Sequence, residues 1–138
     1  MLNYLNYWDG VETFHLYSFT KKDVLRAIEL LDGDDISGIQ VRVDTGATLG
    51  IGGGNGNQFI CLGYPANEGT AHWLISNVKT DSSICDIAFD SDTATVPGEY
   101  VVGLKQLRSA VEWFCDRGEL IPTMTWRKDH PEDFNPWV

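Results

Sequence analysis

The sequence predicts an α+β fold, in which a single antiparallel sheet of about five to seven strands packs with two α-helices. Short alternating segments separated by Gly, Asn and Asp fill the middle of the chain, as in an antiparallel meander. Two other segments carry apolar residues at the helical period. We expect residues 1–138 to form one domain, because a chain of this length buries about 68–70% of its unfolded surface.

The first half of the chain predicts one strand, one helix and then four strands. Residues 11–17 alternate between apolar and polar side chains, which is typical of a strand. Thr20 is the expected N-cap of a helix over residues 21–31, and Gly33 stands where that helix must stop. The four following strands are expected at residues 39–43, 48–52, 58–63 and 71–78.

The second half predicts a long loop, a strong helix and a last strand. We expect residues 79–98 to be loop-rich, with a short strand at 100–102. Residues 104–117 form the strongest predicted helix, because apolar side chains recur there at i, i+3, i+7 and i+10. Gly118 supplies the C-terminal stop, and residues 122–127 are the last expected strand.

The chain is strongly acidic. Ten Lys and Arg against twenty Asp and Glu give a net charge of −10. Direct nucleic-acid binding and binding to anionic membranes are therefore not expected, because both need clustered basic residues. An acidic surface suits a basic protein partner, whose approach opposite charge accelerates. The alternative is that the acidity serves solubility alone.

The acidic residues gather in two groups. Residues 80–99 hold five carboxylates and no Lys or Arg, and a second group follows the first predicted helix. For the second group, a solvated turn, a partner-facing patch and a metal site remain open, although the twelve-residue Ca²⁺-loop pattern is absent. The two groups consist of Asp81, Asp86, Asp90, Asp92 and Glu99, and of Asp32, Asp34 and Asp35.

The glycine-rich stretch and the scattered His and Cys residues do not form a recognisable catalytic or metal motif. Residues 50–56 match neither GxGxxG nor a P-loop, so we expect a hairpin tip there. The three His and three Cys lack metal-ligand spacing, so we expect no metal and no cofactor. Cys85 is the most exposed-looking thiol and leaves a small Cys/His enzyme as an alternative, beside a ligand-binding module.

Two further features concern location and anchoring. Three Cys without a CxxC pair, and an N-terminus without a signal-peptide pattern, favour free thiols in a reducing cytoplasm. Five tryptophans are many for this length. We expect Trp113 and Trp126 in the core, and Trp8, Trp73 and Trp137 as candidates for exposure, either as interface anchors or as edge packing.

The C-terminal third holds a Pro before a short predicted strand, a helix with an Ala-Val-x-x-Phe core, a Gly stop, and a Pro before a strand that ends in Trp. This pattern resembles the closing motif of the first-numbered immunity-protein family of bacterial polymorphic toxin systems. The resemblance is good over residues 97–127 and looser from residue 45. It includes a Gly-rich strand pair at residues 49–62 and departs from the family pattern in the turn at 117–122. The matching positions are Pro97, Ala110, Val111, Phe114, Gly118, Pro122 and Trp126.

The resemblance implies a bacterial cytoplasmic antitoxin without enzymatic activity. It would bind one cognate secreted toxin as a 1:1 heterodimer, and in this family the toxin is often a zinc-dependent nucleic-acid deaminase. The carboxylates would replace nucleic-acid phosphates in the basic cleft of the toxin. A nuclease toxin is the alternative target. The toxin-binding candidates are Asp34, Asp35, Asp81, Asp86, Asp90, Asp92, Trp73 and Trp137.

Overall fold

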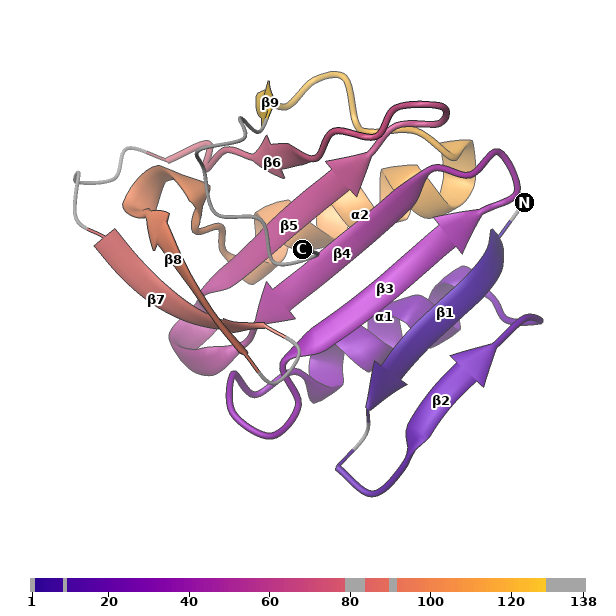
Figure 1. Cartoon of the computed structure of the whole chain (residues 1–138), viewed down its shortest axis with the longest axis horizontal. Helices are drawn as coiled ribbons and strands as arrows, with labels where there is room; N and C mark the ends of the chain where they lie inside the picture. The colour runs from indigo at the N-terminus through magenta and orange to yellow at the C-terminus, as the bar shows by residue number, and fades with distance from the viewer. Residues whose placement is uncertain (1, 9, 79–83, 90–91, 129–138) are drawn as a thin grey trace.

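A seven-stranded antiparallel sheet and a two-stranded hairpin form the β structure of the protein (Figure 1). The computed structural model describes residues 2–8, 10–78, 84–89 and 92–128, with the backbone alone at Asp92. The large sheet has the order β2-β1-β3-β4-β5-β6-β9, and the hairpin pairs β7 with β8. The strands are β1 (Leu2–Trp8), β2 (Thr13–Leu16), β3 (Gly38–Val43), β4 (Thr48–Gly53), β5 (Phe59–Tyr64), β6 (His72–Leu74), β7 (Ile84–Phe89), β8 (Asp92–Pro97) and β9 (Trp126–Lys128).

Two helices, α1 (Lys21–Leu30) and α2 (Leu104–Arg117), cover one face of the large sheet (Figure 1). Their apolar stripes pack on alternate residues of β3, β4 and β5, because side chains of a strand alternate between the two faces. The N-cap of α1 and the C-cap of α2 are the residues that the sequence predicts. The backbone N–H of Thr20 donates to the Asp23 carboxylate over 2.8 Å, and Gly118 ends α2 at φ 71°.

The β7–β8 hairpin packs on the opposite face of the sheet, which we call the outer face. Ile60 and Leu62 of β5 point to this face and form a second apolar core with residues of the hairpin. Gly52 of β4 lies directly under the ring of Phe89 on β7. A methyl group on Gly52 would lie 2.4 Å from Cδ2 of Phe89, so the absence of a side chain permits this contact.

Several predictions are confirmed. The fold is α+β with a mainly antiparallel sheet, and the helix expected at residues 104–117 is α2 with the same bounds. The glycine-rich stretch is a hairpin tip between β4 and β5, where Gly53, Gly54 and Gly56 all have positive φ. The tip includes a 3-10 turn, η1 (Asn55–Asn57). Neither helix in the described part of the chain has the length and hydropathy needed to cross a membrane.

Other predictions are wrong, and some of the differences concern strands that border the candidate site. Strand β1 was not expected, because a bulge between Leu2 and Tyr4 interrupts its alternation. Residues 79–98 are not simply loop-rich, since they contain β7 and β8. The predicted strand at 71–78 shortens to β6. Of the one at 100–102, Tyr100 ends the 3-10 turn η2 (Gly98–Tyr100), and Val102 forms a single antiparallel bridge with Phe59. The last strand begins only at Trp126.

We predict that Gly52→Ala lowers the free energy of unfolding by about 1–3 kcal/mol, because the added methyl group overlaps Phe89 and approaches the Ala88 carbonyl oxygen at 3.2 Å. Urea denaturation followed by circular dichroism measures the change. Gly69→Ala is the matched control, since its added methyl group has no neighbour within 4 Å. Equal midpoints for the two variants would contradict the packing of the hairpin on β4.

Candidate functional site

The charge of the protein is unevenly distributed between its layers. The two helices hold six of the ten Lys and Arg but four of the twenty Asp and Glu. The helices are therefore net +2, whereas the rest of the chain is net −12. The excess negative charge therefore belongs to segments outside the two helices.

The turn after α1 presents carboxylates at one end of the sheet. The Asp32 carboxylate accepts hydrogen bonds from the backbone N–H groups of Asp34 and Ile36, over 2.9 and 3.0 Å. These two bonds lower the pKa of Asp32 below its ordinary range, because they stabilise the ionised form. Asp32 thus holds the turn in shape, while the side chains of Asp34 and Asp35 are exposed to solvent.

Strand β7 brings a further carboxylate to the same end. The exposed Asp86 carboxylate accepts a hydrogen bond from the Thr95 hydroxyl over 2.8 Å. A hollow of about 60 Å³ lies between β7 and the turn after α1, and a methyl group on Gly33 would lie 2.5 Å from Cβ of Asn55. The tip between β4 and β5 therefore joins the two acidic segments. We call Asp32, Asp34, Asp35 and Asp86 the acidic end.

No basic residue of the surrounding segments neutralises the acidic end. The sequence has no Lys or Arg in residues 27–41, 43–78 or 80–104, which include every segment that lines the hollow. Like charges gathered without counter-charges produce a negative potential that reaches about 8–10 Å at physiological salt. Such a surface attracts a cationic partner and repels nucleic acid.

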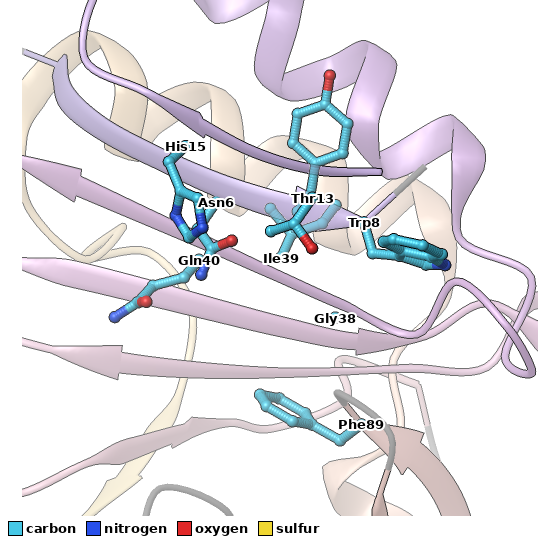
Figure 2. A pocket seen from close by; sticks show the side chains of 9 residues that line it. Asn6, Trp8, Thr13, His15, Gly38, Ile39, Gln40 and Phe89 are labelled. Carbon is cyan, nitrogen blue, oxygen red and sulfur yellow. The ribbon is translucent and has the colours of Figure 1, made fainter. Parts of the chain in front are cut away.

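A second hollow, of about 150 Å³, lies on the outer face of β2, β1 and β3. Figure 2 shows Asn6, His15 and Gln40 gathered at one end of it, with Trp8 towards the other end and Phe89 across from them. These side chains come from four strands. The hollow offers amide, imidazole and aromatic groups and contains no carboxylate, so its chemistry differs from that of the acidic end.

The two hollows are neighbours. Ala88 lines the acidic hollow and Phe89, the next residue of β7, lines the polar and aromatic one. On the other side, a methyl group on Gly10 would lie 3.9 Å from Oδ2 of Asp35. The turn between β1 and β2 thus touches the acidic turn, and one continuous surface includes both hollows.

The structure places Asp86 and the turn that holds Asp34 and Asp35 at one end of the sheet, and it corrects one tryptophan. Asp86 and Gly33 line the same hollow, and Asp34 and Asp35 follow Gly33 in the turn as exposed side chains. The expected exposure of Trp73 is wrong, because its side chain is 1% exposed and stacks on Tyr100 with ring centroids 5.1 Å apart. Trp73 points to the outer face, where the hairpin covers it. Asp81, Asp90 and Trp137 lie outside the described residues, as does the side chain of Asp92.

Two of the three cysteines, Cys61 and Cys115, are poor nucleophiles. Burial raises the pKa of Cys61 to about 12, and burial with the nearby Asp116 does the same for Cys115. Both thiols therefore stay protonated at neutral pH. Cys85 is half-buried on β7. Among the described residues, no group of three His, Cys, Asp or Glu side chains is arranged to hold a metal ion.

Sequence reasoning missed most of the second hollow. Asn6 and Gln40 were not singled out, because β1 was not predicted and its pairing with β3 was therefore invisible. The sequence places His15 in a predicted strand and without metal-ligand spacing, whereas its neighbours in the fold include Tyr4, whose hydroxyl oxygen is 2.9 Å from Nδ1. The one available signal was the content of Tyr and Trp in residues 2–8, which are residues common in strands.

Comparisons with known proteins identify one family. The family model described as immunity protein Imm1 matches residues 16–128, which is most of the chain. The family predicted from residues 97–127 is thereby confirmed, and the match extends well beyond those residues. Searches of curated proteins and of solved structures gave no significant match.

We predict that Asp32→Ala destabilises the fold by about 1 kcal/mol at neutral pH, because two backbone N–H groups lose their partner. The pKa of Asp32 is lowered in the folded protein, so its contribution exists above the ordinary value of 3.8 and is lost as pH falls below it. Denaturation of wild type and variant should therefore differ at pH 7, and the difference should shrink as the pH falls through the lowered pKa of Asp32. Asp34→Ala, an exposed control, should show little difference at any pH in this range.

Proposed function

The chain belongs to the Imm1 family of immunity proteins, and from that premise we propose that it occupies the nucleic-acid cleft of one cognate bacterial toxin. It acts by binding and not by catalysis, in the bacterial cytoplasm and as a 1:1 complex. The observation that supports a cleft-blocking mode best is the acidic end. There the turn that carries exposed Asp34 and Asp35 lines one hollow with Asp86, and the lining segments contain no basic residue.

Electrostatic reasoning links these carboxylates to the cleft. A toxin that acts on DNA or RNA needs basic groups that contact phosphates. Carboxylates on a rigid surface compete with phosphates for the same groups, and they do so without offering a reactive base. The acidic end is rigid because Asp32 fixes its turn and the Thr95 hydroxyl holds Asp86. Rigid charges lose little entropy on binding.

We propose that the toxin is a nucleic-acid deaminase. The resemblance of residues 97–127 to the family motif supports this class, because many toxins opposed by the family are deaminases. Such enzymes bind a flipped base beside a zinc ion of their own, in a cleft flanked by phosphate-binding residues. A protein bound across that cleft prevents entry of the substrate. The zinc belongs to the toxin, so the immunity protein itself requires no cofactor.

The direct test uses the toxin domain encoded beside this gene. The toxin is incubated with single-stranded and double-stranded DNA and RNA, with and without this protein. Mass spectrometry of the nucleosides detects deamination, and gel electrophoresis detects strand cleavage. We expect deamination that disappears at an equimolar amount of this protein. Strand cleavage without deamination would replace the deaminase with a nuclease, and full activity in the presence of this protein would contradict the proposed function.

We predict that neutralising the acidic end slows association. In the variant with Asp34→Asn, Asp35→Asn and Asp86→Asn, the association rate constant for the toxin should fall about tenfold at low salt, because long-range attraction is lost. The association rate constant of this variant should also depend less on salt concentration than that of the wild type. The matched control replaces Glu29, Glu112 and Glu119 with Gln, which changes the net charge equally but on the helices and at the end of α2. Equal effects of both variants would show that only the net charge matters.

A further inference from the structure

The outer face of β2, β1 and β3 displays aromatic side chains. The hairpin core involves β5 and β6, whose residues Ile60, Leu62 and Trp73 it buries. The described outer-face residues of β1, β2 and β3 are half-buried or exposed. We define the aromatic face by six of these residues. They are Tyr4, Trp8, His15, Tyr17, Gln40 and Arg42.

Ring contacts connect the aromatic face across three strands. Tyr4 lies at the centre, with the Tyr17 ring centroid at 5.4 Å and the Arg42 guanidinium carbon at 5.3 Å from its own centroid. The Tyr4 ring is also stacked near His15, at 6.2 Å. Because the strands are hydrogen-bonded to each other in one sheet, these side chains are held in position before any partner binds.

The exposure of these side chains is more than folding requires. Tyr17 is 73% exposed and Trp8 is 37% exposed. By contrast, Trp73 is 1% exposed, so the fold readily buries a tryptophan of the same sheet face. Tyr, Trp and Arg are the residues that dominate the binding energy of protein interfaces, where they are enriched at the centre.

The position and charge of the aromatic face indicate what it binds. It adjoins the acidic end through Gly10 and Phe89, so a toxin bound at one reaches the other. Its charged member is Arg42, which does not suit the basic cleft itself. The hollow beside Trp8 has a volume of about 150 Å³, which is enough for one inserted side chain of the toxin. The amide of Gln40 lines this hollow and can form a hydrogen bond with such a side chain.

We propose that the aromatic face binds a neutral, apolar-bearing surface of the same toxin beside its basic cleft, and that it determines how slowly the complex dissociates. This inference rests on the proposed function. The acidic end acts through long-range charge and governs association, whereas the aromatic face acts through short-range contacts that form only after encounter. Salt therefore affects the two surfaces differently, since screening weakens charge attraction and leaves ring packing intact.

The test measures both rate constants for the toxin domain encoded beside this gene, at low and high salt. Trp8→Ala and Tyr17→Ala should each raise the dissociation rate constant about tenfold or more, as truncation of an interface anchor does. The association rate constant and its salt dependence should stay unchanged. Leu30→Ala is the control, because Leu30 on α1 is 38% exposed, which nearly equals the exposure of Trp8.

A second variant separates binding from folding. Tyr17→Phe keeps the ring that packs on Tyr4, so it should retain slow dissociation, whereas Tyr17→Ala should lose it. Thermal unfolding of each variant checks that the fold persists. Rapid dissociation of Tyr17→Ala with an unchanged unfolding midpoint supports the inference.

Three results would overturn it. Unchanged dissociation in Trp8→Ala and Tyr17→Ala, while the acidic-end variant still associates slowly, removes the aromatic face from the interface and leaves the proposed function intact. A wild-type homodimer that Tyr17→Ala dissociates in sedimentation experiments assigns the face to a second copy of the chain. Failure of the wild type to bind the toxin overturns the inference together with the proposed function.

Discussion

The packing of the β7–β8 hairpin on the glycine-containing strand β4 determines what the outer face presents. Phe89 approaches the backbone of Gly52 more closely than any side chain there would allow. This contact fixes the hairpin over the second half of the sheet, and it places Asp86 beside the turn that follows α1. On β1, β2 and β3, the described outer-face residues include exposed Trp8, His15 and Arg42. One steric constraint therefore places the hairpin beside both the acidic end and the aromatic face.

The two surfaces use forces of different range, which suits a protein that must act quickly and hold for long. Charge attraction raises the rate of encounter but distinguishes poorly between toxins, because every nucleic-acid cleft is basic. Short-range packing distinguishes between shapes, since a wrong partner leaves groups such as Gln40 without hydrogen bonds. The acidic end thus favours a class of toxins, and the adjoining face selects within that class.

Local patterns in the sequence predict the helices well and the sheet edges poorly. The helix at residues 104–117 depends on its own periodicity and on Gly118, both of which are local. Strand β1 contains a bulge, so its alternation shifts and the strand escapes detection. In the hairpin, buried Ile87 and Phe89 do alternate with other residues, but the acidic residues around them favour a loop interpretation.

The candidate site is still harder to predict, because it depends on contacts between distant segments. Composition identifies Asp34, Asp35 and Asp86 as acidic residues, yet only the fold shows that Asp86 and the turn that begins at Gly33 line one hollow beside the β4–β5 tip. The side to which Trp73 points follows from strand alternation, whereas its burial follows from the hairpin that covers that side. A sequence pattern thus states which face a side chain occupies, and tertiary packing decides whether that face remains available for a partner.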